Sequence, residues 1–275
     1  MTAGEPAMTG SERVDQALVT RGLARSRAVA RDLVLAGRVR SGADTIDKPS
    51  VKVTPDTELE VVGEVDPWVG RAAHKLLGAL AAFGEVDPAG LRAIDVGAST
   101  GGFTQVLLSR GAAVVEAVDV GHGQLAPAVR DDDRVRDHSG TTVRGIDPET
   151  IGGPADLVVT DLSFISLTLV AADLARLLTD DGHLVALVKP QFEVGRERLG
   201  HGGVVRSPRE RARAVRAVLE AIDAAGLTVH GLDRSVVAGT TGNQEYLLWA
   251  RKRGAGKMDD AAIAAFVTTI EQEDG

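Results

Sequence analysis

The feature that most constrains the fold is a glycine-rich turn between a short apolar strand and an apolar helix start: Ala93-Ile94-Asp95-Val96-Gly97-Ala98-Ser99-Thr100-Gly101-Gly102-Phe103. Small residues in such a turn let the backbone approach a ligand closely, as in the first strand–helix turn of nucleoside-binding α/β domains. The turn therefore predicts an α/β domain with a cofactor at one edge of its sheet.

The spacing within this turn leaves two cofactor classes open. The dinucleotide pattern G-x-G-x-x-G seats a pyrophosphate on a helix N-terminus, whereas this chain reads D-x-G-x-S-x-G-G. A carboxylate ahead of the glycines suits a cationic ligand such as S-adenosylmethionine better than a pyrophosphate. A nicotinamide-dependent oxidoreductase remains the alternative, weakened by the missing third-glycine spacing.

Apolar runs separated by helical segments predict buried parallel strands in a doubly wound sheet, at residues 92–96, 114–118, 157–161 and 184–188. Ligands of such sheets bind beyond the carboxyl ends of the strands, where Asp95, Asp119, Asp161 and Lys189 stand. The sequence thus predicts four charged groups around one crevice, with Asp119 placed to bind ribose hydroxyls. Two last strands, near 228–237 and 245–250, are expected to complete the sheet as an antiparallel pair.

Composition narrows the possible classes of protein. At 275 residues and 44% hydrophobic content, the chain is long enough for one large and one small domain. It has no cysteine, and its six histidines show no ligand spacing, so we expect no disulfide, thiolate nucleophile or metal site. No apolar run reaches about 18 residues and the start lacks signal-peptide features, so we expect a cytoplasmic protein without a membrane span.

The net charge of −8 conceals a basic segment near the N-terminus. Residues 11–53 carry nine basic and five acidic side chains, and their pattern predicts a small α+β unit with a helix N-cap at Ser26. Long cationic side chains on one face match a phosphate backbone, although a solvated helix surface is the alternative. The candidate RNA-binding residues here are Arg13, Arg25, Arg27, Arg31, Arg38 and Lys48.

This segment resembles the RNA-binding module of a small-subunit ribosomal protein, which also occurs in pseudouridine synthases and tyrosyl-tRNA synthetases. The likeness rests on residues 13–15, 22–28, 37–39 and 48–49. We therefore assign 1–10 to a disordered start, 11–64 to an RNA-binding domain and 65–70 to a linker. Trp68 in this linker either fixes one domain to the next or fills a core.

The remainder of the chain resembles the TlyA family of ribosomal RNA 2′-O-methyltransferases, which have an FtsJ-like catalytic domain. The likeness rests on residues 70–76, 95–103, 161–166, 187–193 and 242–246. It implies a Rossmann-like S-adenosylmethionine-dependent methyltransferase sheet over 71–253, followed by a C-terminal helix within 254–275. It further implies a cytidine ribose in 16S and 23S rRNA as acceptor.

The resemblance also implies the residues of the site. Lys75, Asp161, Lys189 and Glu245 match the catalytic tetrad, and the cofactor-binding set is Asp95, Gly97, Ala98, Ser99, Gly101, Gly102, Phe103, Asp119 and Asp161. One departure concerns the run Thr141-Thr142-Val143-Arg144, where the family is expected to have Thr-Asn-Ala-Arg. A cofactor contact from Thr142 is therefore open.

The tetrad suggests a mechanism, because a ribose 2′-hydroxyl needs a positioned base to attack a methyl group at neutral pH. Our hypothesis makes Lys189 the base, Asp161 and Glu245 its orienting groups, and Lys75 the cation that favours neutral Lys189. Phe164 either stacks on a base pulled out of its helix or packs in the core.

Two other functions remain as alternatives. The basic module alone would explain a noncatalytic RNA-binding protein, although four polar groups converging at strand ends speak against one. The family is also labelled as haemolysins, but the lack of an apolar span argues against direct pore formation. The oligomeric state is not predicted.

Overall fold

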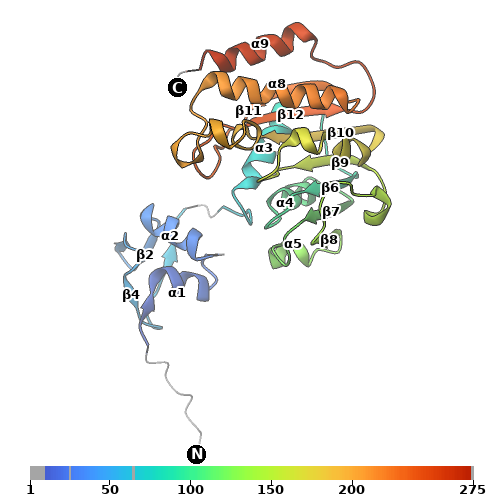
Figure 1. Ribbon diagram of the computed structural model, residues 1–275. Coiled ribbons are helices and arrows are strands. Elements are labelled where there is room, and N and C mark those ends of the chain that lie inside the picture. Colours follow the sequence, from blue (N-terminus) through green and yellow to red (C-terminus); the bar gives the residue numbers. More distant parts are fainter. Residues whose placement is uncertain (1–9, 25, 64–65, 274–275) are drawn as a thin grey trace, which may run out of the picture. The chain divides into compact units, whose positions relative to one another are not determined.

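The computed structural model describes residues 10–24, 26–63 and 66–273, which form two compact units divided after Pro67 (Figure 1). The expected disordered start lies outside the described residues, apart from Gly10. Residues 68–70, which we expected in the linker, belong to the second unit. Trp68 and Val69 pack there against a buried apolar cluster, which agrees with the core-filling alternative for Trp68.

Where the structure describes it, the first unit consists of two short helices and two small sheets. Its elements are β1 (Glu12–Arg13), α1 (Val14–Thr20), α2 (Arg27–Leu35), β2 (Val39–Ser41), β3 (Asp44–Ile46), β4 (Lys52–Val53) and β5 (Glu60–Val61). Strand β1 pairs with β4, and β2 lies between β3 and β5, all antiparallel. Strand β3 was not predicted, because only its last residue is buried and its sequence lacks an apolar alternation.

Local sequence signals explain where the second helix of this unit begins and ends. The Ser26 hydroxyl accepts a hydrogen bond from the Val29 amide at 3.3 Å, which confirms the predicted N-cap. Gly37, with φ of +67°, lets the chain turn after the helix end. Apolar side chains from both helices and from β2 and β4 then form the core of the unit.

The second unit is built on a sheet of seven strands in the order β11-β12-β10-β9-β6-β7-β8. Its strands are β6 (Arg92–Val96), β7 (Val114–Asp119), β8 (Val135–Ser139), β9 (Ala155–Thr160), β10 (Leu178–Val188), β11 (Thr228–Arg234) and β12 (Tyr246–Arg251). Its α-helices are α3 (Ala72–Ala82), α4 (Gly102–Ser109), α5 (Pro127–Arg130), α6 (Ala171–Arg176), α7 (Pro190–Glu193), α8 (Pro208–Ala224) and α9 (Asp260–Glu271). Strands β6 to β10 pair in parallel, while β12 is antiparallel to both neighbours.

Side chains alternate between the two faces of the sheet and bury both of them. In β9, Leu157 and Val159 pack with α3 and α4, whereas Val158 packs on the opposite side with α6 and α8. Because both faces are covered, the central strands are apolar throughout, as the sequence predicted. Strand β8 was missed because it is an edge strand of which only Val135 is buried.

Gly231 marks a point of close packing where the register of β11 and β12 shifts. A Cβ atom added there would lie 2.7 Å from Cε1 of Phe83, on the end of α3. We expect Gly231→Ala to lower the free energy of unfolding by about 1–3 kcal/mol, because the ring must move within a packed core. Urea denaturation measures this effect. Gly84→Ala, with open space around its added Cβ, is the matched control; equal losses in both variants would contradict the packing argument.

Candidate functional site

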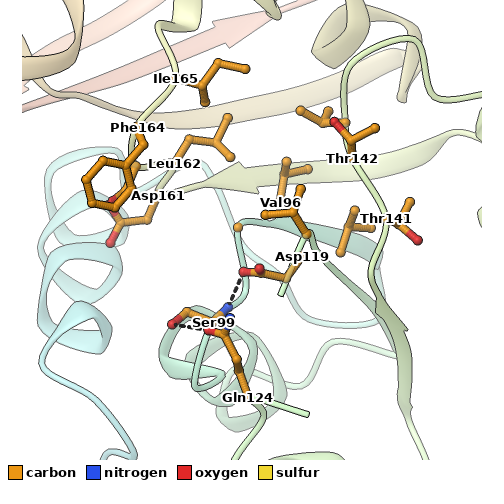
Figure 2. A pocket seen from close by; sticks show the side chains of 15 residues that line it. Val96, Ser99, Asp119, Gln124, Thr141, Thr142, Asp161, Leu162, Phe164 and Ile165 are labelled. Atoms are coloured by element: carbon orange, nitrogen blue, oxygen red, sulfur yellow. Dashed lines mark hydrogen bonds between the residues drawn. The ribbon is translucent and has the colours of Figure 1, made fainter. Parts of the chain in front are cut away.

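A cavity of about 530 Å³ lies at the carboxyl ends of β6, β7 and β9 (Figure 2). This volume falls in the range of small-molecule and cofactor sites. Apolar side chains line much of it, including Val118, Val120, Val143, Leu162 and Ile165. Polar groups come from Ser99, Asp119, Gln124, Thr141, Thr142 and Asp161. The mixture suits a ligand with both a flat apolar part and several polar groups.

The glycine-rich turn forms one wall of this cavity. Gly97 has φ of +86°, and a Cβ atom added to it would lie 3.3 Å from Leu162 and 3.4 Å from the Asp161 carbonyl oxygen. Glycine therefore serves both the backbone conformation and the close approach of two loops. Ser99 also has positive φ, of +48°, which exposes its backbone at the cavity.

Asp119 is held rigidly at the end of β7. Its carboxylate accepts a hydrogen bond from the backbone amide of Ser99 at 2.8 Å (Figure 2). It also accepts one from the Gly121 amide at 2.7 Å. The Ser99 hydroxyl donates in turn to Gln124 at 3.2 Å. A carboxylate fixed in this way can still accept hydrogen bonds from a ribose diol, because each oxygen has two lone-pair directions.

The predicted cofactor set divides into two groups. Gly97, Ser99, Asp119 and Asp161 line the cavity. The others, Asp95, Ala98, Gly101, Gly102 and Phe103, are buried and outside its lining. Gly101 still matters for the turn, because it precedes the first residue of α4 with a φ of +90°. A Cβ atom added to it would also lie only 2.8 Å from Val129. These residues shape the turn and do not form the wall of the cavity.

Asp95 differs from the rest because it is a fully buried carboxyl within β6. One of its oxygens accepts a hydrogen bond from the Thr104 hydroxyl at 2.6 Å, and the other has no hydrogen-bond partner among the residues that the structure describes. Burial raises the pKa of Asp95 from 3.8 to about 7, against the opposing effect of Thr104. This carboxyl is therefore largely protonated below neutral pH.

The four predicted catalytic residues lie together beside the cavity. Lys189 follows β10 and its Nζ lies 2.7 Å from Asp161 Oδ1, while Lys75 Nζ on α3 lies 3.4 Å from Asp161 Oδ2. Lys75 also approaches Glu245 Oε2 at 2.6 Å, just before β12. Parallel strands β9 and β10 end at the same edge of the sheet, and antiparallel β12 begins there, which brings these distant residues together.

The cluster is shielded from solvent, with side-chain exposures of 6% for Lys75, 7% for Lys189 and 2% for Glu245. The side chain of Asp161 is 12% exposed and lines the cavity, so it connects the cluster to the cavity. Lys189 Nζ additionally donates to the Ser163 hydroxyl at 2.9 Å. The two sites are therefore continuous through the loop after β9.

The arrangement within the cluster differs in one respect from the predicted roles. Glu245 contacts Lys75, and its other oxygen accepts a hydrogen bond from Gln191 Nε2 at 3.1 Å. Lys189 contacts Asp161 and Ser163 instead. Glu245 therefore orients Lys75 and not Lys189, because the start of β12 faces α3. The sequence did not identify Ser163 and Gln191 as partners, although both follow predicted strands.

Phe164 is 92% exposed and adopts φ of +66°, which excludes the alternative that it packs in the core. Its ring lines the cavity (Figure 2). The centre of this ring lies 5.3 Å from that of the Phe192 ring. Glu193 anchors the following residues, accepting hydrogen bonds from the Leu167 amide, at 2.9 Å, and the Ser166 hydroxyl. Burial raises the pKa of Glu193 despite these bonds. An exposed ring on an anchored loop is suited to contact a substrate.

The predicted RNA-binding residues of the first unit are engaged to different degrees. Asp15 binds Arg13 at 3.0 Å and Arg27 at 3.3 Å, and these guanidinium groups lower the pKa of Asp15. Arg38 donates to the Val62 carbonyl at 3.0 Å. Arg31 and Lys48 are exposed, and Arg25 lies outside the described residues. The geometry thus leaves Arg31 and Lys48 most accessible to a phosphate.

Comparison with known proteins identifies both units. Residues 68–252 match the FtsJ-like methyltransferase family, and residues 12–59 match the S4 domain. The "16S/23S rRNA (cytidine-2'-O)-methyltransferase TlyA" of Mycobacterium tuberculosis is 51% identical over 245 residues, covering 89% of this chain and 91% of that protein. The chain belongs to the TlyA family of FtsJ-like methyltransferases. The predicted family, fold class and cofactor, S-adenosylmethionine, are thereby confirmed.

Other members of the family carry a different name. "Hemolysin A" of Brachyspira hyodysenteriae is 34% identical, covering 86% of this chain and 98% of that protein. A solved structure from Streptococcus thermophilus, whose description also contains the word hemolysin, has a TM-score of 0.74 at 39% identity and covers 95% of this chain and 96% of its own. Within the described ranges, no helix is both long and apolar enough to cross a bilayer, and no cluster of side chains suited to a metal ion is found.

The buried carboxyl of Asp95 predicts a pH-dependent stability. Between its unfolded pKa of 3.8 and its folded pKa of about 7, the unfolded state loses a proton that the folded state keeps, so rising pH destabilises the fold. An asparagine side chain cannot ionise, so the Asp95→Asn variant does not lose stability in this way as the pH rises. Its stability relative to the natural chain should therefore rise by up to roughly 4 kcal/mol from pH 4 to pH 8, measured by urea denaturation. The exposed Asp131→Asn is the control; parallel profiles for Asp95→Asn and the natural chain would refute the shift.

Proposed function

We propose that this enzyme transfers a methyl group from S-adenosylmethionine to the 2′-hydroxyl of a cytidine ribose in 16S and 23S rRNA. The observation that carries the proposal is the position of Asp161, which lines the cofactor cavity and also contacts both lysines. The relative from Mycobacterium tuberculosis, named for this reaction, supports the choice of acceptor. The S4 unit supports ribosomal RNA as the partner. Because ribosomal RNA is cytoplasmic, we also propose that the enzyme acts in the cytoplasm.

The cavity suits S-adenosylmethionine on the chemistry of its lining. Asp119 is fixed to accept the ribose hydroxyls, the apolar side chains around Val120 and Leu162 suit the adenine, and Gly97 leaves room at the turn. The buried unpaired oxygen of Asp95 lies below this turn. When bound, the cofactor supplies a methyl group on a sulfonium that departs as a neutral thioether.

The residues of the cluster then account for the acceptor. In this role Lys189 takes the proton of the 2′-hydroxyl as the new oxygen–carbon bond forms and the carbon–sulfur bond breaks. Asp161 and Ser163 fix the direction of the Lys189 amine through their contacts at 2.7 and 2.9 Å. Lys75, held by Glu245, contacts the other oxygen of Asp161. In this proposal Glu245 acts through Lys75.

Phe164 would hold the target nucleotide for this step. Its exposed ring at the rim of the cavity can stack on a base taken out of its RNA helix, because every base has a flat face that an aromatic ring can contact.

Substitution of Lys189 tests the base. Lys189→Arg places a guanidinium beside Asp161 that cannot accept the proton, so methyl incorporation into ribosomal subunits in single-turnover assays should fall by at least about 10²-fold. Lys189→Ala should be equally inactive, with S-adenosylmethionine affinity retained in both. Lys257→Ala is the control. If either Lys189 variant kept activity within tenfold of the natural chain, Lys189 would not be the base.

Substitution of Phe164 tests the stacking. Phe164→Ala should reduce kcat/KM for the RNA substrate by about 10- to 100-fold, since base–aromatic stacking is worth about 1–3 kcal/mol. Because the ring is 92% exposed, Tm and cofactor affinity should not change. Leu169→Ala, at 60% exposure, removes a comparable exposed side chain. A large fall in Tm, or a loss of cofactor affinity equal to the loss of rate, would assign the ring to the protein's own structure.

A further inference from the structure

The exposed side of α8 carries a row of arginines. Arg209, Arg213 and Arg216 recur at intervals of four and three residues, so they follow one side of the helix, and Arg206 lies just before its start. All four residues are exposed, whereas the opposite side of α8 is buried against the sheet. Successive cations along the helix therefore lie about 5 Å apart along its axis. We call these four residues the arginine row.

The row begins at the edge of the sheet that carries the catalytic cluster. Asn243, two residues before Glu245, accepts a hydrogen bond from the Val205 amide at 2.9 Å and donates to the Gly203 carbonyl at 2.9 Å. These bonds fix the chain just ahead of Arg206. Helix α8 then runs back beside α9 to the opposite edge, where β11 starts (Figure 1). The row thus leads away from the candidate active site.

The charges of the row are available to a partner at its catalytic end. Within the part of the chain that the structure describes, no carboxylate pairs with Arg206 or Arg209. Arg213 lies 4.0 Å from Glu210, and Arg216 binds Glu271 at 2.8 Å at the far end. Guanidinium groups without a partner can bind phosphate oxygens in a bidentate manner. Such a row is unusual on a chain whose net charge is −8.

We propose that the arginine row binds the phosphate backbone of the RNA substrate next to the nucleotide in the active site. The inference rests on the proposed function and extends it from the cavity to a second surface of the methyltransferase unit. Contacts with phosphates supply affinity and orientation and carry no base specificity. The row therefore holds the strand on the methyltransferase unit itself, independently of the S4 unit.

The test is the salt dependence of binding by the full chain to purified ribosomal subunits that lack the 2′-O-methyl group. Arg206→Gln/Arg209→Gln should weaken binding at least about tenfold near 0.1 M salt. It should also reduce the slope of log Kobs against log salt by about two, since each lost phosphate contact lowers it by about one. The KM for subunits should rise while kcat and S-adenosylmethionine affinity stay unchanged.

The matched control is Arg110→Gln/Arg253→Gln, which removes the same charge from exposed positions at the opposite edge of the sheet. The proposal would be overturned if the two double variants had equal effects, or if Arg206→Gln/Arg209→Gln left the salt slope unchanged. These outcomes include the case in which the row binds an acidic protein instead of RNA. Binding is measured without methyl donor, so its outcome is separate from catalysis. A natural chain that binds subunits through the row but transfers no methyl group would refute the proposed function alone.

Discussion

The site depends on one carboxylate shared between the amines of two buried lysines. Asp161 contacts Lys189 on one oxygen and Lys75 on the other, and Lys75 is held in turn by Glu245. Removing such charges from water is costly, and the cost is met only when each charge has a well-placed partner. The chain of contacts therefore fixes the relative positions of α3, β9, β10 and β12 as much as it arranges a reaction.

The sheet explains why these charges can be held so near one another. Strands β9 and β10 run parallel with apolar side chains on both faces, so their first polar residues appear only where the strands end. Insertion of antiparallel β12 beside β10 adds the start of a strand to the same edge. The polar groups thus collect where the backbone leaves the core, and the loops after β6, β7 and β9 form a cavity beside them.

Much of this arrangement was predictable, because buried strands are long apolar runs and their ends are marked by charged residues. The sequence alone placed Asp119, Asp161 and Lys189 at one edge, and the family resemblance added Lys75 and Glu245. What it could not give was the pairing of side chains across elements. That Glu245 faces Lys75 depends on how α3 packs against the sheet. Asp95 lies outside the lining of the cavity and contacts Thr104 on α4 instead. Likewise, the polar edge strands β3 and β8 form because a neighbouring strand offers hydrogen bonds, and their own sequences show little alternation of apolar and polar residues.

The insertion of β12 between β10 and β11 has a consequence for synthesis of the protein. Glu245 and β12 are among the last parts of the methyltransferase unit to be made, and they fill an interior position in the sheet. A nascent chain that stops before this point retains the S4 unit and the glycine-rich turn but lacks one quarter of the charged cluster. Because β12 lies between β10 and β11, the sheet cannot be completed until synthesis of the methyltransferase unit is nearly finished.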